Sequence, residues 1–383
     1  MLIVNGRVYP MDGAVIESGF VEIGNGVIKS VGPMSDAPSD SETFDAEGGY
    51  VLPGLVDAHC HLGMWEDALG FEGSDGNEMT DPVTPHLRAI DAINPRDRCF
   101  EDALKAGVTA VMTGPGSANP IGGQFAALKT SGGRVDDMVL LAPASLKLAL
   151  GENPKGVYHG KDKSPETRMA TAAIIRDAFY RAGEYLKKKE KARCDKEKDP
   201  PTYDIKLEAL VLALTGALRA NFHAHRADDI FTAIRISKEF GLDYALVHCT
   251  EGHLIAKELA AEGARVITGP SLCDRSKPEL LNLTFDTPGI LSRAGVLTAI
   301  CTDHPVIPLS YLILCAALAH KAGMDELEAM RAVTRNPAII AGIGGRVGAL
   351  LPGLDADIAV YTAHPFDVMA RVSAVFVDGG RTV

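Results

Sequence analysis

The most chemically suggestive stretch of the sequence is Val51-Leu-Pro-Gly-Leu-Val-Asp-Ala-His-Cys-His-Leu-Gly63. A Pro-Gly turn precedes the apolar pair Leu55 and Val56, so we predict a short buried strand that ends near His59 and His61. Side chains two residues apart in a strand point to the same face, so the two imidazoles can bind one metal ion. Neutral imidazole is a suitable ligand for zinc, iron, nickel and copper.

Further residues of metal-binding types stand where later apolar segments end. They are Glu152 or Lys147, then His223 with His225, then His248, and finally Asp303. In a β/α barrel the functional side chains come from the C-terminal ends of the strands. A single histidine at such a place is more often part of the scaffold, but five strand ends with ligand-type residues are hard to obtain by accident. We therefore predict that these residues converge on one ion or on an ion pair.

The expected chemistry is hydrolysis. A bound divalent ion would lower the pKa of a water molecule and polarise a carbonyl group. Asp303 can bind metal weakly and can also accept the proton of the water, although an aspartate before His304-Pro305 could instead cap a helix. We interpret Asp57 as a buried hydrogen-bonding anchor behind the site.

The rest of the chain must form the elements that position these residues. Residues 1–50 have the short apolar runs and the Asn-Gly and Asp-Gly turns of an all-β segment, and the pattern returns to β after Gly353. Between these segments, apolar strands alternate with amphipathic helices. We predict an α/β fold: a TIM-like (β/α)8 barrel over residues 51–350, with a small β-sandwich domain built from residues 1–50 and 351–383.

Two segments do not fit a regular barrel. Between Pro154 and Asn221 no separate strand is evident, so the barrel could be degenerate there, with the charged segment 186–200 in its place. We interpret that charged segment as the solvated end of a helix or a mobile insertion; a substrate lid is the alternative. The Gly-rich stretch Thr113–Gly123 lacks the spacing of a P-loop or a dinucleotide-binding motif, so we expect an ordinary loop above a strand.

The composition excludes several classes of partner. The 383 residues carry a net charge of -12, which argues against nucleic acid or an anionic membrane surface as the main partner. The seven cysteines are scattered and odd in number, which favours reduced thiols. The first residues lack the pattern of a signal peptide. We expect a cytoplasmic homo-oligomer that acts on a small molecule.

Taken together, the motifs resemble the metal-dependent amidohydrolase superfamily. The resemblance is carried by Leu52-Pro-Gly-Leu-Val-Asp-Ala-His-Cys-His, by the strand-end histidines His223 and His248, and by Thr302-Asp303. The tail from Asn336-Pro-Ala to Pro352-Gly-Leu-Asp-Ala-Asp is also similar. The branch it resembles most is the one related to imidazolonepropionase, which also contains dipeptidases.

The resemblance implies a role for each of these residues. His59 and His61 match the ligands of the first strand, His223 the ligand of the fifth, His248 that of the sixth, and Asp303 the acid of the eighth. In members with two ions, the fourth strand supplies a glutamate or a carboxylated lysine. We favour Glu152, which is a carboxylate as it stands, over Lys147, which would need to react with CO₂.

The substrate-binding residues are less clearly indicated. Arg226 could pair with a substrate carboxylate, or it could be a surface residue near Asp228. His225 and Trp65 could line the pocket.

The expected function is hydrolysis of an amide-like C–N bond in a cyclic amide or a dipeptide. We expect zinc as the metal, with iron, manganese and nickel as alternatives, in one or two copies. Deamination of a heterocycle is the alternative reaction, and a non-catalytic metal-binding or ligand-binding protein is the alternative from another class.

Overall fold

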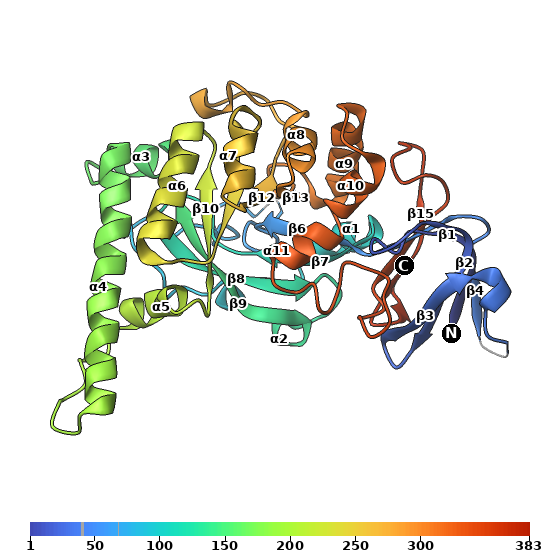
Figure 1. Cartoon of the computed structure of the whole chain (residues 1–383), viewed down its shortest axis with the longest axis horizontal. Coiled ribbons are helices and arrows are strands. Elements are labelled where there is room, and N and C mark those ends of the chain that lie inside the picture. Colours follow the sequence, from blue (N-terminus) through green and yellow to red (C-terminus); the bar gives the residue numbers. More distant parts are fainter. Residues whose placement is uncertain (40–41, 68) are drawn as a thin grey trace.

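The computed structural model describes residues 1–39, 42–67 and 69–383. Figure 1 shows an elongated molecule with an α/β barrel between two extensions. A β-rich unit with both chain termini lies at one end, and the long helix α4 (Arg168–Cys194) protrudes at the other. None of the helices in the described ranges combines the length and the apolar character that crossing a membrane requires.

Eight strands form the barrel sheet, in the spatial order β13, β12, β11, β10, β9, β8, β7, β6. They are β6 (Leu55–Cys60), β7 (Val108–Thr113), β8 (Ile121–Lys129), β9 (Val139–Ala149), β10 (Arg219–Ala224), β11 (Tyr244–His248), β12 (Arg265–Thr268) and β13 (Leu297–Ile300). Neighbouring strands pair in parallel, except that β8 runs antiparallel to both β7 and β9. The predicted α/β barrel is confirmed.

Strand β8 is the main departure from the predicted arrangement. From the sequence we expected a loop over Thr113–Gly123 and a missing barrel strand after Pro154. The structure instead has an antiparallel strand, β8, which begins at Ile121, before β9. Every residue of β8 is buried, so no alternation of polar and apolar side chains marks it in the sequence. The preceding glycines allow close packing: a Cβ atom on Gly114 would lie 2.3 Å from Cγ of Phe125.

The ends of the sheet, β6 and β13, are bridged by other groups. Asp57 Oδ2 on β6 accepts hydrogen bonds from the backbone N (2.8 Å) and Oγ1 (2.7 Å) of Thr302, just after β13. Residues 332–333 also lie between the two strands, and their carbonyl oxygens accept hydrogen bonds from the backbone N–H groups of Val56 and Ile300. These contacts nearly close the barrel and fix the relative position of its first and last strands.

Helices cover the outside of the barrel, and α6 to α9 lie side by side along one face in Figure 1. Besides α4, the helices are α1 (Arg98–Lys105), α2 (Val135–Met138), α3 (Glu152–His159), α5 (Ile205–Leu214), α6 (Ala227–Phe240), α7 (Ala256–Ala261), α8 (Thr287–Arg293), α9 (Leu312–Lys321), α10 (Glu326–Arg331) and α11 (Arg335–Ile340). Buried side chains such as Phe179 on α4 and Ile234 on α6 pack with Phe222 on the strands. The charged segment 186–200 is the mostly exposed end of α4 and the turn after it, as predicted.

The two ends of the chain form a second sheet, in the order β16, β15, β14, β5, β1, β2, β3, with β4 paired to β1. The strands are β1 (Leu2–Val8), β2 (Ile16–Gly24), β3 (Val27–Pro33), β4 (Thr43–Asp45), β5 (Tyr50–Pro53), β14 (Ile358–Tyr361), β15 (Val372–Val377) and β16 (Gly380–Arg381). Antiparallel pairing of β14 with β5 joins the two termini in one unit, as predicted. The unit is one continuous sheet, and its apolar core includes Ile3, Val360 and Phe376.

A buried ion-pair cluster connects this unit to the barrel. Lys129 Nζ, at the end of β8, lies 2.8 Å from Asp355, 3.0 Å from Asp357 and 2.5 Å from Asp378. Burial alone would lower the pKa of Lys129, but the carboxylates, Asp357 foremost, raise it above its usual value. The lysine therefore stays charged and compensates carboxylates from the second unit.

Candidate metal centre

The first candidate metal group consists of His59, His61 and Asp303. The two histidines lie at the end of β6 and point the same way because they are two residues apart. Their Nε2 atoms lie 3.4 Å (His59) and 3.2 Å (His61) from Oδ1 of Asp303. Two ligands of one tetrahedral zinc ion, each about 2.0–2.2 Å from it, are about 3.4 Å apart. The three atoms therefore have the spacing of ligands to a single ion.

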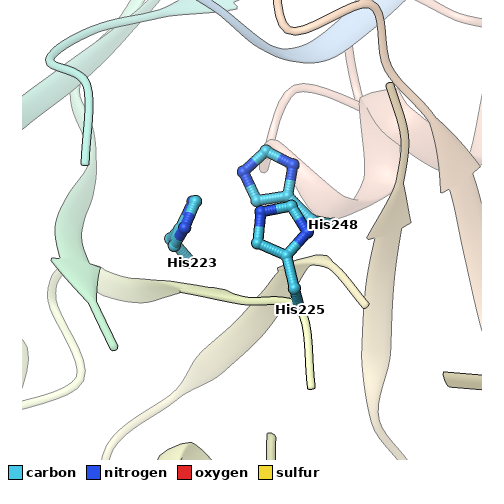
Figure 2. Close-up of side chains that lie close together, drawn as sticks. All are labelled: His223, His225 and His248. Atoms are coloured by element: carbon cyan, nitrogen blue, oxygen red, sulfur yellow. The ribbon is translucent and has the colours of Figure 1, made fainter. Parts of the chain in front are cut away.

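The second candidate group consists of His223, His225 and His248, whose ligand atoms lie within 4.8 Å of one another. Figure 2 shows the three rings gathered at one point, with His223 beside the other two. Their ring centroids are 4.5 to 4.7 Å apart. The structure thus brings His225, which we expected to contact substrate, into a ligand group with the two predicted ligands. His248 also contacts the ring of His59, so the two groups adjoin.

Hydrogen bonds to Nδ1 orient several of these rings. His61 Nδ1 donates to the carbonyl oxygen of Gly114 (2.6 Å), and His248 Nδ1 donates to that of Gly269 (2.7 Å). Because a carbonyl oxygen can only accept, Nδ1 carries the proton and Nε2 keeps its lone pair. His225 Nδ1 lies 2.7 Å from Oγ1 of Thr250, a hydroxyl that can donate or accept, and this contact fixes the orientation of the ring. The rings therefore present Nε2 to a metal ion.

The structure places Lys147, and not Glu152, among the histidines. Lys147 on β9 is fully buried, with Nζ 3.1 Å from Nε2 of His59 and 5.7 Å from the ring centroid of Phe125. Burial lowers the pKa of Lys147 to about 8. Glu152 is half-buried beyond the end of β9, at the start of α3, where it lines an open surface depression with Lys155. The structure favours the alternative, Lys147, because the strand ends at Ala149, before Glu152.

Asp57 acts as the predicted anchor behind the site. In addition to the two hydrogen bonds from Thr302, Asp57 accepts one through Oδ1 from the backbone N of His59 (2.9 Å). Burial raises the pKa of Asp57 to about 7, and these hydrogen bonds oppose the rise. The carboxylate therefore ties His59 to the residue that precedes Asp303. Asp303 and His248 both have positive φ angles, +53° and +75°, which non-glycine residues rarely adopt.

The charge state of the groups suits a cation. Burial lowers the pKa of His59 and of His225 to about 3, and it lowers the pKa values of His223 and His248 well below their usual range. These four imidazoles are therefore neutral near pH 7. Burial alone would raise the pKa of Asp303, but the adjacent histidines, His248 foremost, hold it well below its usual value. Neutral nitrogen donors around one carboxylate are the ligand set that zinc, iron, nickel or manganese would fit.

Trp65 lies beside the first metal group and is not itself among the residues that line the neighbouring cavity. Its ring meets the ring of His61 edge to face, with centroids 4.8 Å apart. Its other side packs against Gly76 and Gly116, where a Cβ atom would lie 2.1 and 2.8 Å from the indole. Both glycines line a cavity of about 600 Å³. This volume suits a small-molecule ligand.

Arg226 does not point to the metal groups. Its guanidinium donates to both carboxylate oxygens of Asp228 (3.0 and 2.8 Å), and its side chain is 43% exposed. The predicted contact with a substrate carboxylate is therefore replaced by the alternative, a surface ion pair at the start of α6.

Three further residues near the second group were not found by sequence reasoning. Glu279 Oε1 lies 4.0 Å from Nε2 of both His223 and His225. Asn153 Nδ2 lies 3.4 Å from His223 Nε2, and Asn153 Oδ1 accepts a hydrogen bond from Lys277 (2.8 Å). Glu279 and Lys277 lie in the long segment after β12, and no spacing relative to a strand end marks them in the sequence.

A barrel with metal-binding types of side chain at the ends of its strands is typical of a class of metal-dependent hydrolases. Comparison of the sequence with known families identifies which one. The sequence matches the profile of the Amidohydrolase family over residues 50–382. The chain belongs to this family, and it is an enzyme that acts on C–N bonds. The family generally uses a divalent metal and acts on small molecules.

Individual relatives agree with this assignment. The crystal structure of an amidohydrolase from Thermotoga maritima has a TM-score of 0.96 at 44% identity and covers 100% of this chain and 99% of that one. Amidohydrolase tasK of Hapsidospora irregularis is 32% identical over 371 residues, or 91% of this chain, which spans only 38% of that relative's length. Imidazolonepropionase of Geobacillus kaustophilus is 26% identical over 393 residues, with coverage of 91% and 85%. The resemblance to the imidazolonepropionase-related branch is confirmed.

Proposed function

We propose that the chain is a divalent-metal-dependent hydrolase that cleaves an amide-like C–N bond in a cyclic amide or a dipeptide. The observation that supports this most directly is the spacing of His59, His61 and Asp303, whose ligand atoms are 3.2 and 3.4 Å apart. The adjoining group of three histidines favours two ions over one. Zinc is the metal we favour for these nitrogen donors.

Different residues of the chain would bind the metal and transfer the proton. His59, His61 and Asp303 would hold one ion, and His223 with His248 would hold the other. When bound, the metal would lower the pKa of a water molecule and polarise the substrate carbonyl. Asp303 would accept the proton of that water and deliver it to the leaving nitrogen.

Lys147 is the residue we propose as the fourth-strand ligand, after reaction with CO₂. The uncharged amine attacks the carbon of CO₂ to form an N–C bond, one C=O π bond opens to leave a negatively charged oxygen, and the nitrogen releases a proton to water, which converts the buried lysine into a carbamate anion. Its position next to His59 and its lowered pKa both support this, because only the uncharged amine reacts. The product would place an anion between neutral imidazoles that would otherwise share only Asp303.

Metal analysis of the purified full chain tests the proposal. After incubation with zinc, manganese or iron, we expect about two ions per chain, together with hydrolysis of members of a panel of dipeptides and cyclic amides that stops on chelation and returns on reloading. A folded sample that stays metal-free would contradict the proposal. Ammonia release from aminated heterocycles, without hydrolysis of the panel, would favour deamination instead.

Asp303→Asn separates metal binding from proton transfer. We expect the variant to retain most of its metal, because the histidine ligands remain, and to lose turnover by roughly 100- to 10,000-fold, the usual contribution of a proton-transfer group. Unchanged turnover would show that another group carries the proton.

A further inference from the structure

Glu279 is a buried carboxylate whose position none of the roles above explains. It lies in a short 3-10 turn (Pro278–Leu280) after β12 and is 1% exposed. Oε2 accepts a hydrogen bond from the backbone N of Glu152 (3.1 Å). Oε1 has no hydrogen-bond partner among the residues that the structure describes. Because an unpaired buried polar atom is costly, this oxygen calls for a partner that is not a protein group.

The unpaired oxygen points at the second histidine group. Oε1 is equally far, 4.0 Å, from Nε2 of His223 and of His225. At this distance neither nitrogen forms a hydrogen bond with the carboxylate oxygen. The three atoms surround a point that a cation could occupy.

The surroundings hold Glu279 in this orientation without neutralising it. A Cβ atom on Gly151 would lie 2.6 Å from Oε2, so a larger residue there would push the carboxylate out of its present position. Gly151 also has a φ of +85°, which other residues rarely adopt. Arg168 is 3.9 Å from Oε2, but its guanidinium is bonded to Asp229 at 3.0 Å. Lys277 Nζ donates to Asn153 instead (2.8 Å), so within the described part of the chain neither cation forms a hydrogen bond with Oε1.

We propose that Glu279 is a metal ligand that completes the second group as a set of three histidines and one carboxylate. This inference rests on the proposed function, because it requires a divalent ion in that group. Ligands of one tetrahedral ion lie about 3.4 Å apart, so metal binding requires Glu279 Oε1 to move about half an ångström closer to His223 and His225. A mixed nitrogen and oxygen set of this kind suits zinc, iron or manganese.

The experiment compares metal retention in the wild-type chain, Glu279→Gln and Glu152→Gln. Glutamine keeps the size of the buried side chain and removes the charge. Glu152→Gln is the matched control, because it leaves in place the backbone N–H that contacts Glu279. Each protein is loaded with zinc and titrated against chelators of graded strength, and bound zinc is counted by mass spectrometry.

We expect about two ions in the wild-type chain and in Glu152→Gln, and one tightly held ion in Glu279→Gln. The affinity for the other ion should fall by more than the roughly 10–100-fold that loss of an outer hydrogen-bond partner causes. Equal retention by Glu279→Gln would overturn the inference, as would metal retention combined with loss of turnover, which would make Glu279 an acid or base. A wild-type chain that binds no metal would count against the proposed function itself.

A crystal structure of the zinc-loaded wild-type chain tests the inference even if the variant does not fold. We expect a Glu279 oxygen within the zinc–carboxylate bond length of about 2.0–2.2 Å from an ion that His225 also binds. A separation beyond about 3.5 Å, or an ion bound without Glu279, would overturn the assignment.

Discussion

Replacing Lys147 with methionine should stabilise the metal-free chain and abolish catalysis. Lys147 is fully buried, and burial lowers its pKa from 10.5 to about 8. The difference of 10.5 − 8, or about 2.5 units, corresponds to about 3 kcal/mol at about 1.4 kcal/mol per unit. The folded pKa lies below the unfolded one, so the unfolded chain binds more protons between pH 8 and 10.5. Burial of the Lys147 ammonium therefore lowers the free energy of unfolding by the full amount below pH 8. The loss becomes smaller as the pH rises from 8 to 10.5.

Methionine removes this penalty and also some favourable contacts. The lost contacts are those with His59 and the ring of Phe125, worth about 1 kcal/mol together. At pH 7 we expect Lys147→Met to unfold with a free energy about 2 kcal/mol higher than the wild-type chain. At pH 10, where most of the penalty has gone, we expect almost no difference.

The assay is urea-induced unfolding of metal-free, CO₂-depleted chains at pH 7 and pH 10, with Glu152→Gln as the control. Comparing each variant with the wild-type chain at the same pH cancels the titration of other groups. A Lys147→Met chain that is less stable at pH 7, or a difference that is the same at both pH values, would refute the reasoning that the ammonium is uncompensated. After metal loading, Lys147→Met should lack turnover, and Glu152→Gln should keep it.

Other substitutions test the supporting contacts. Asp57→Asn places an amide N–H opposite the donors of Thr302, so unfolding experiments should show a loss of about 3 kcal/mol, and wild-type stability would contradict the anchor role. Lys129→Met leaves the buried carboxylate of Asp357 without its cation, whereas Asp355 keeps Arg346, and we expect a loss of about 3–5 kcal/mol in the same assay; a neutral effect would mean that the cluster does not join the two units. Arg226→Ala should leave kcat/KM unchanged and alter stability by no more than about 1 kcal/mol, whereas a large fall in kcat/KM would restore its role in substrate binding.

The first metal group could be predicted from sequence because its geometry is local. His59 and His61 are two residues apart at a strand end, and strand periodicity alone places them on one face. The same argument applies to His223 and His225 at the end of β10, although we expected only the first to bind metal. The period of the strand places both rings on one face, and this inference does not depend on which residues a related family uses.

The choice between Lys147 and Glu152 could not be made from sequence, because it depends on where β9 stops. A carboxylate needs no modification, and this favoured Glu152 on chemical grounds. The strand ends at Ala149, and β9 pairs with β10 so that Ala149 lies opposite His223. Glu152 has therefore already left the barrel wall, whereas Lys147 still points inward. Glu279 was missed for a related reason: it follows β12 by a long irregular segment, in which strand periodicity carries no information.

The unusual backbone at the site explains why contacts behind the ligands matter as much as the ligands. Asp303 and His248 adopt positive φ angles, which cost about 1–3 kcal/mol each for residues with side chains. Hydrogen bonds from neighbouring strands hold both: Asp57 binds the residue before Asp303, and the carbonyl oxygen of Gly269 binds the ring of His248. Loss of either contact would let the backbone relax and move a ligand atom away from the ion. Metal affinity in this enzyme should therefore depend on residues that never touch the metal.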